Sequence, residues 1–114
     1  MKATLHKFLL SLVLISACLS SGCSSVTPVT NNINAPRNVD QVEVLYQDPQ
    51  RPYEVIALIS HEALTRFATV SGVIQKCREL AAKVGADAVI ITSTYDQTFN
   101  TAAKAAGKAI RWKR

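Results

Sequence analysis

The stretch VSGVIQKCRELAAKVGADAVII, residues 70–91, decides the fold. Its first part repeats apolar residues every three or four positions, which places them along one face of a helix. These residues are Val70, Val73, Ile74, Cys77, Leu80, Ala81 and Val84. Gly85 follows the last of them, where a helix commonly ends in a left-handed residue. Because Ala86 to Tyr95 then contains an unbroken apolar run, the sequence predicts a helix that leads through a short loop into a buried strand.

Two apolar segments precede this helix. Residues 41–46 alternate, with Val42 and Val44 on one face, which indicates a strand. Two prolines in the segment 48–52 interrupt the pattern, and the apolar run resumes from Tyr53 to Ser60. We therefore predict a strand-turn-strand hairpin. Its second strand is apolar on both faces, which favours a central position in the sheet.

A last short strand is predicted from Ala109 to Trp112, after the polar stretch 96–108. Ile110 and Trp112 lie on one face of it. The predicted fold class is α+β: a small β-β-α-β-β domain over residues 39–114, in which one sheet is covered by one amphipathic helix.

The first 22 residues are typical of an export signal. Lys2 and Lys7 begin it, and the mostly apolar run from Phe8 to Leu19 is shorter than the roughly 20 residues that span a membrane. Small residues then precede a cysteine twice, as in the bacterial lipobox, at Ile15-Ser16-Ala17-Cys18 and Ser20-Ser21-Gly22-Cys23. Such small side chains fit a peptidase cleft, and the thiol then carries a diacylglycerol.

We favour Cys23 as the lipidated residue, with Cys18 as the alternative. Cys23 follows the fuller apolar region, whereas Cys18 has the usual branched residue three positions before it. Neither cysteine is followed by the aspartate of an inner-membrane retention signal, so we expect a lipoprotein of the outer membrane, on its periplasmic side, held by palmitate-type acyl chains. If Cys23 is lipidated, Cys77 is the only thiol left in the domain. If Cys18 is lipidated, a disulfide between Cys23 and Cys77 is open as an alternative.

Residues 23–38 have the composition of a disordered tether, rich in Ser, Thr and Asn and without an apolar period. About 15 such residues reach roughly 50 Å when fully extended. We therefore expect the domain to stand off its membrane.

The charge of the chain does not predict nucleic-acid binding. Without Lys2 and Lys7, 11 of the 13 basic residues remain against 8 acidic ones, a mild excess. We expect the late basic residues to be solvated rather than to bind an anionic surface. These are Lys104, Lys108, Arg111, Lys113 and Arg114.

We predict no catalytic, cofactor-binding or metal-binding residue. Ser60, His61 and Glu62 are consecutive, whereas triad members converge from separate parts of a fold, so His61 is expected to be a surface histidine in a loop. The domain has one His and one Cys, too few for a typical metal site, and Cys77 is expected to be a buried hydrophobe. The aromatic residues are expected as core or cross-strand pairs. They are Tyr46, Tyr53, Tyr95 and Trp112.

Four motifs fall within these elements: VEVLY at 42–46, RPYEVI at 51–56, GADAVII at 85–91 and AIRW at 109–112. Together they resemble a group of small uncharacterised bacterial lipoproteins. The Gly-Ala-Asp-Ala sequence at 85–88 is also similar to the outer-membrane lipoprotein sensor of the Rcs envelope-stress phosphorelay and to YbjQ-like putative heavy-metal-binding domains. These resemblances imply an α+β fold. The two disulfides that the Rcs resemblance implies have no counterpart, because the domain keeps only Cys77.

The expected function is therefore a non-enzymatic binding, sensing or structural role for a lipid-anchored envelope protein, with an envelope protein as possible partner. The alternative is a small ligand-binding or hydrolytic domain that acts on cell-wall or outer-membrane material. Polar side chains converging in a cleft around His61 would favour the alternative, and a flat sheet face with exposed aromatics would favour a partner surface.

Overall fold

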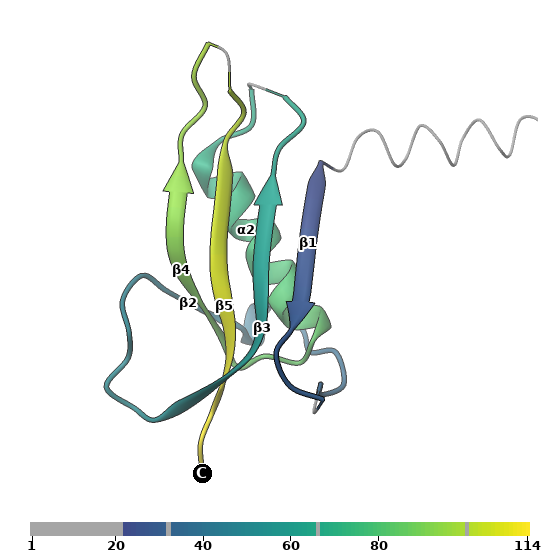
Figure 1. The fold of residues 1–114 in the computed structure, drawn as a ribbon, viewed down its shortest axis with the longest axis vertical. Coiled ribbons are helices and arrows are strands. Elements are labelled where there is room, and N and C mark those ends of the chain that lie inside the picture. The colour runs from purple at the N-terminus through teal and green to yellow at the C-terminus, as the bar shows by residue number, and fades with distance from the viewer. Residues whose placement is uncertain (1–21, 32, 66, 100) are drawn as a thin grey trace, which may run out of the picture.

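The computed structural model describes residues 22–31, 33–65, 67–99 and 101–114. Within them, helix α2 (Val70–Lys83) covers one face of a five-stranded sheet (Figure 1). The strands are β1 (Cys23–Pro28), β2 (Glu43–Leu45), β3 (Tyr53–Glu62), β4 (Ala88–Tyr95) and β5 (Lys104–Trp112), and a 3-10 helix, η1 (Val39–Gln41), precedes β2. The predicted α+β class, with one sheet and one covering helix, is confirmed.

Helix α2 begins and ends close to where the sequence predicts. The Thr69 side chain caps its start, because Oγ1 accepts a hydrogen bond from the Gly72 amide at 3.1 Å. Gly85 follows its end with φ at 73°, a left-handed conformation that favours glycine. A Cβ at this position would also lie 2.6 Å from the carbonyl oxygen of Ala35. The turn from α2 into β4 therefore needs a glycine for two independent reasons.

The core lies between α2 and the covered face of the sheet. Val73, Cys77 and Ala81 are fully or almost fully buried there, as the helical periodicity predicts. These helix residues pack against large side chains of β3 and β4 and against small side chains of β5. The buried sheet residues in this cluster include Ile56, Ile59, Val89, Ile91, Ala105 and Ala109. Because β5 contributes small residues, the helix lies close to the middle of the sheet, and Cys77 Sγ is 3.7 Å from the Ala105 carbonyl oxygen.

The predicted hairpin between the first two strands of the domain is wrong. The strand order is β1-β3-β5-β4-β2, and β2 pairs in parallel with β4, with Leu45 opposite Ile90. The loop 46–52 carries the chain from β2 at one edge back to β3 across the sheet (Figure 1). Apolar alternation locates a strand but does not choose its neighbour. The interior position predicted for β3 is confirmed, since β1 and β5 flank it.

Strand β5 is longer than the four residues predicted. It runs for nine residues and pairs with both β3 and β4. Its first half consists of Lys, Ala and Gly, which lack the large apolar side chains that mark a strand in sequence. Ala105 and Gly107 are nevertheless buried, because the helix and the two neighbouring strands enclose them.

The prediction of a disordered tether over 23–38 is wrong for its first part. Cys23–Pro28 forms the edge strand β1, antiparallel to β3, with Val26 packed against the core. The segment continues to make backbone bonds, from the Val29 amide to Ile56 and from the Arg37 amide to Ala82. Strand β1 lies at the edge of the sheet, and only Val26 in it is partly buried. Such a strand needs few apolar side chains, so its Ser- and Thr-rich sequence cannot be distinguished from a linker by composition.

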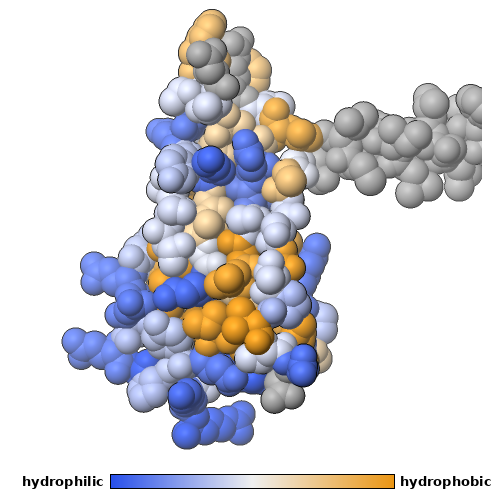
Figure 2. All heavy atoms as spheres, in the orientation of Figure 1, coloured by the Kyte–Doolittle hydropathy of each residue, from blue (hydrophilic) through white to orange (hydrophobic). Residues whose placement is uncertain are grey.

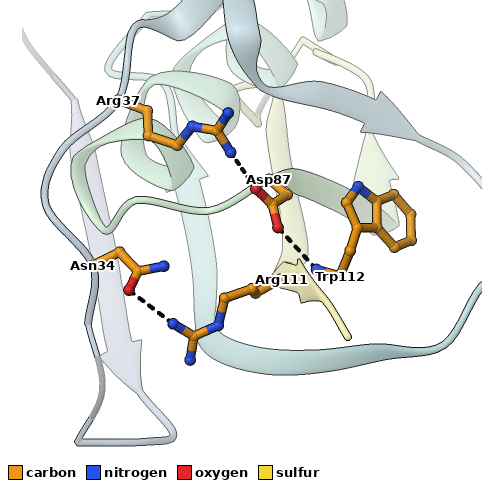
Figure 3. A network of polar contacts seen from close by, with 5 residues as sticks. All are labelled: Asn34, Arg37, Asp87, Arg111 and Trp112. Atoms are coloured by element: carbon orange, nitrogen blue, oxygen red, sulfur yellow. Dashed lines mark hydrogen bonds and ion pairs between the residues drawn. The ribbon is translucent and has the colours of Figure 1, made fainter. Parts of the chain in front are cut away.

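A polar network closes the end of the sheet at which α2 passes into β4 (Figure 3). Asp87 forms an ion pair with Arg37, and its second carboxylate oxygen accepts a hydrogen bond from the Trp112 amide at 2.9 Å. Arg111 donates to the side-chain oxygen of Asn34 at 2.8 Å. The network therefore joins the segment after β1 to the end of β5.

Candidate functional site

The favoured lipidation residue, Cys23, is the first residue of β1. Its side chain is exposed, its thiol is free, and it lies opposite Glu62 at the end of β3. The alternative Cys18 and residues 1–21 of the expected signal lie outside the described residues. In the part of the chain that the structure describes, no helix is long and apolar enough to span a membrane.

His61 lies next to this position and is 4% exposed, so the prediction of a surface histidine in a loop is wrong. Strand β3 continues through Glu62, and His61 therefore points toward the covered face, away from its two neighbours. Its Nδ1 is 2.7 Å from the hydroxyl oxygen of Ser24 in β1. Gly22 lies over the other edge of the ring, where an added Cβ would be 3.2 Å from Nε2.

The surroundings of His61 favour the neutral form of its imidazole. Burial lowers the pKa of its imidazole below the ordinary 6.5, and the positive charge of Lys76 lowers the pKa further, whereas Glu79 opposes both effects. The contact between this imidazole and the Ser24 hydroxyl joins β1 to β3. The sequence marks Ser24 only as part of the Ser24-Ser25 pair that follows Cys23, and its contact with His61 depends on a strand pairing that composition does not reveal.

Two hollows lie on either side of His61. One, of about 230 Å³, lies between the end of β3 and the start of α2 and is lined by Leu64, Val73 and Lys76. The other, of about 290 Å³, lies at the end of the sheet where Cys23 begins β1, and Tyr95 and Lys104 line it. It is also lined by Cys23, Ser25, Ser60, Glu62 and Ser93. We call this second hollow the Tyr95 groove.

Tyr95 and Lys104 form a cross-strand pair in the Tyr95 groove. They are directly opposite in the register of β4 and β5, and Lys104 Nζ lies 4.6 Å from the centre of the Tyr95 ring. Tyr95 is 58% exposed, so one side of its ring remains available to a partner. The groove therefore offers an aromatic surface, an ammonium group and several hydroxyl groups.

The prediction of core or cross-strand aromatic residues is confirmed for Tyr53 and Trp112 and is wrong for Tyr46. Tyr53 and Trp112 are opposite each other in β3 and β5, which confirms a cross-strand pair. The Arg51 guanidinium lies 4.7 Å from the centre of the Trp112 ring. Tyr46, by contrast, is 65% exposed.

Cys77 is fully buried, as predicted, and burial raises the pKa of its thiol to about 11. Its thiol and that of Cys23 are both free. Among the described residues, no group of three or more His, Cys, Asp and Glu side chains gathers in a way that would hold a metal ion.

No protein-family model and no curated protein matches the sequence. Among solved structures, the chain is similar to the crystal structure of FvfA, a Francisella virulence factor, with a TM-score of 0.55 and 15% sequence identity. The similarity covers 76% of this chain and 95% of that one. At this identity the likeness shows a shared fold.

Proposed function

We propose that the protein is a lipid-anchored envelope protein with a non-enzymatic binding, sensing or structural role on the periplasmic side of the outer membrane. The observation that carries the proposal is the position of Cys23. It ends the lipobox-like sequence Ser20-Ser21-Gly22-Cys23 and lies exposed at the start of an edge strand. An exposed thiol at the start of the described chain leaves room for a thioether-linked lipid.

The sheet pairing gives this anchor an unusual geometry. If Cys23 carries the lipid, the acyl chains attach to the first residue of β1 and no tether separates them from the sheet. Cleavage before Cys23 removes Gly22 and leaves the acylated amino group beside His61. With Cys18 as the anchor, the four residues 19–22 give a spacer of at most about 14 Å.

Acylation is tested by mass spectrometry of the mature amino terminus. We expect a diacylglycerol and an amide-linked acyl chain on Cys23, and loss of both in Cys23→Ala. Cys18→Ala is the matched control and should leave acylation and membrane fractionation unchanged. An unacylated amino terminus would overturn the proposal, and loss of acylation in Cys18→Ala alone would move the anchor to that residue.

The Tyr95 groove is the surface that we assign to an envelope partner. Its Tyr95 face, the Lys104 ammonium group and the carboxylate of Glu62 suit a peptide segment that carries both apolar and charged side chains. A photoreactive amino acid at the exposed Ser93 should capture that partner in intact cells. The same residue at the exposed Thr27, outside the groove, is the control, and equal capture at both positions would argue against the groove.

The alternative, a hydrolytic domain, is favoured by one observation, the 2.7 Å contact between the Ser24 hydroxyl and the His61 imidazole. A serine beside a histidine is part of a nucleophile arrangement, although catalysis also needs donors for the developing oxyanion. Under this alternative, hydrolysis of a small ester probe by the purified protein should stop in Ser24→Ala and persist in Ser25→Ala. If the wild-type protein hydrolyses the ester no faster than Ser24→Ala, the hydrolytic alternative is rejected.

A further inference from the structure

Two loops project from the end of the sheet at which β1 begins (Figure 1). One follows β3 and the other joins β4 to β5, and a backbone hydrogen bond of 2.9 Å from the Ala63 amide to the Ala103 carbonyl connects their bases. The first contains a turn closed by the Ala68 amide and the Thr65 carbonyl. Both loops are thus anchored to the sheet and to each other.

The second loop is closed in a similar way. The Thr98 amide donates to the Thr101 carbonyl at 2.8 Å, and the Thr101 amide donates to the Thr98 hydroxyl at 3.2 Å. In both turns some backbone amide and carbonyl groups are already hydrogen-bonded within the turn. The free-energy cost of transferring these groups from water to a less polar environment is therefore lower.

Each loop carries a phenylalanine that is far more exposed than the core side chains. Phe67 is 79% exposed and Phe99 is 85% exposed, and Leu64, beside the first turn, is 54% exposed. Figure 2 shows pale-orange apolar side chains at this end of the molecule, a larger apolar area lower on the same face, and mainly hydrophilic side chains at the opposite end. Apolar side chains at loop ends, in place of the polar residues common there, indicate a surface that is covered in the working protein.

We propose that Leu64, Phe67 and Phe99 insert into the boundary between headgroups and acyl chains of the membrane that holds the lipid anchor, so that the domain docks end-on. This inference rests on the proposed acylation of Cys23. Cys23 pairs with Glu62 immediately before the first loop, so an acyl chain on Cys23 enters the membrane beside both loops. Because β1 is paired to the sheet from Cys23 onward, no flexible segment separates the lipid from the sheet, and the end of the sheet that carries the two loops must face the membrane.

The charges at this end favour apolar insertion over electrostatic attachment. In the sequence near the loops, Arg66 and Lys104 are matched by Glu62 and Asp96, and Lys76 forms an ion pair with Glu79, so the charges at this end largely cancel. Aromatic and aliphatic side chains bind the interfacial region of a bilayer through apolar burial, which salt does not screen. We therefore expect docking to persist at high ionic strength.

Brominated phospholipids test this orientation, because they quench tryptophan fluorescence only at short range. The acylated mature protein is reconstituted into phosphatidylethanolamine and phosphatidylglycerol vesicles with brominated acyl chains. In the wild type, the quenching signal comes from Trp112 at the far end of β5. Trp112 lies eight residues along the strand from Lys104, a distance of about 26 Å at 3.3 Å per residue. Phe67→Trp and Phe99→Trp, each combined with Trp112→Phe, report from the loops. Leu58→Trp in the same background is the matched control, since Leu58 is 48% exposed in the middle of the sheet.

We expect tryptophan at 67 and at 99 to lose about half of its fluorescence, as interfacial burial to a depth of 5–10 Å implies. Tryptophan at 58 and at 112 should change by less than about a tenth, because both lie far outside that depth. Quenching at 58 and 112 without quenching at 67 and 99 would overturn end-on docking. An acylated protein with no quenching at the loops would overturn the docking alone, whereas an unacylated Cys23 would overturn both the anchor and the docking.

Discussion

At Asp87, one carboxylate holds two distant segments to the end of the sheet. One of its oxygens pairs with Arg37, which follows β1, and the other accepts the Trp112 amide at the end of β5 (Figure 3). The sequence draws attention to this aspartate only through the Gly-Ala-Asp-Ala resemblance. The structure gives that motif a structural explanation: Gly85 permits the turn and Asp87 satisfies the backbone around it.

Gly85→Ala should destabilise the fold by about 2 kcal/mol or more, since a left-handed backbone penalises a Cβ and the Ala35 carbonyl crowds it. Gly72→Ala is the matched control. Gly72 has ordinary helical geometry with only Thr69 Oγ1 at 3.5 Å, so this change should be neutral or stabilise by roughly 0.5 kcal/mol. Urea unfolding of both variants measures the difference, and equal midpoints would contradict the assigned role of Gly85.

His61 should make stability depend on pH. Because its pKa is lowered in the folded state, the unfolded chain binds the proton more readily, and stability is complete above the unfolded pKa of 6.5. Stability should fall as the pH decreases through 6.5 and should level off below the folded pKa. Urea midpoints between about pH 5 and 8 measure this effect. His61→Gln should flatten the profile in this range, and an unchanged slope would assign it to other groups.

At the level of elements, β1 places one apolar side chain against the core. Val26 packs against the core, whereas the neighbouring Thr27 is exposed on the opposite face. Val26→Asp should detach β1 and speed hydrogen exchange of its amides by about tenfold or more, while the pairing of β3 with β5 remains. Thr27→Asp introduces the same charge one residue away and should leave exchange unchanged. Equal exchange in the two variants would mean that β1 is held by its backbone bonds.

The elements that the sequence predicts well are those with a repeating apolar pattern. Helix α2 and strands β3 and β4 have such a pattern, so their positions are predicted closely. Strand β1 and the first half of β5 do not, because an edge strand and a strand packed under a close helix are built from small residues. The pairing of β2 with β4 depends on contacts between distant segments, which periodicity does not encode.

The candidate site follows the same rule. Cys23 and Cys77 are recognisable because their neighbours in sequence define a lipobox-like pattern and an apolar stripe. The burial of His61 and its contact with Ser24 arise only once β1 pairs with β3, whereas the composition of residues 23–38 is that of a linker.

At the scale of the whole molecule, removal of residues 104–114 should abolish folding. β5 lies between β3 and β4 and supplies the hydrogen bonds that join the two halves of the sheet. Removal of Lys113 and Arg114 alone is the control. It should lower the free energy of unfolding by less than about 1 kcal/mol, because it removes one backbone hydrogen bond, from the Lys113 amide to the Pro52 carbonyl. Circular dichroism and urea unfolding distinguish the two outcomes. A cooperative transition in the longer truncation would contradict the central role of β5.

The central position of β5 also has a consequence for the order of events during synthesis. Strand β5 follows β3 and β4 in the sequence and lies between them in the sheet, so these two strands have no common neighbour until β5 has been made. Under the export that we propose, this delay would keep the chain unfolded while its amino-terminal segment is engaged. Strand β1, at the edge, would then join the finished sheet after the proposed cleavage.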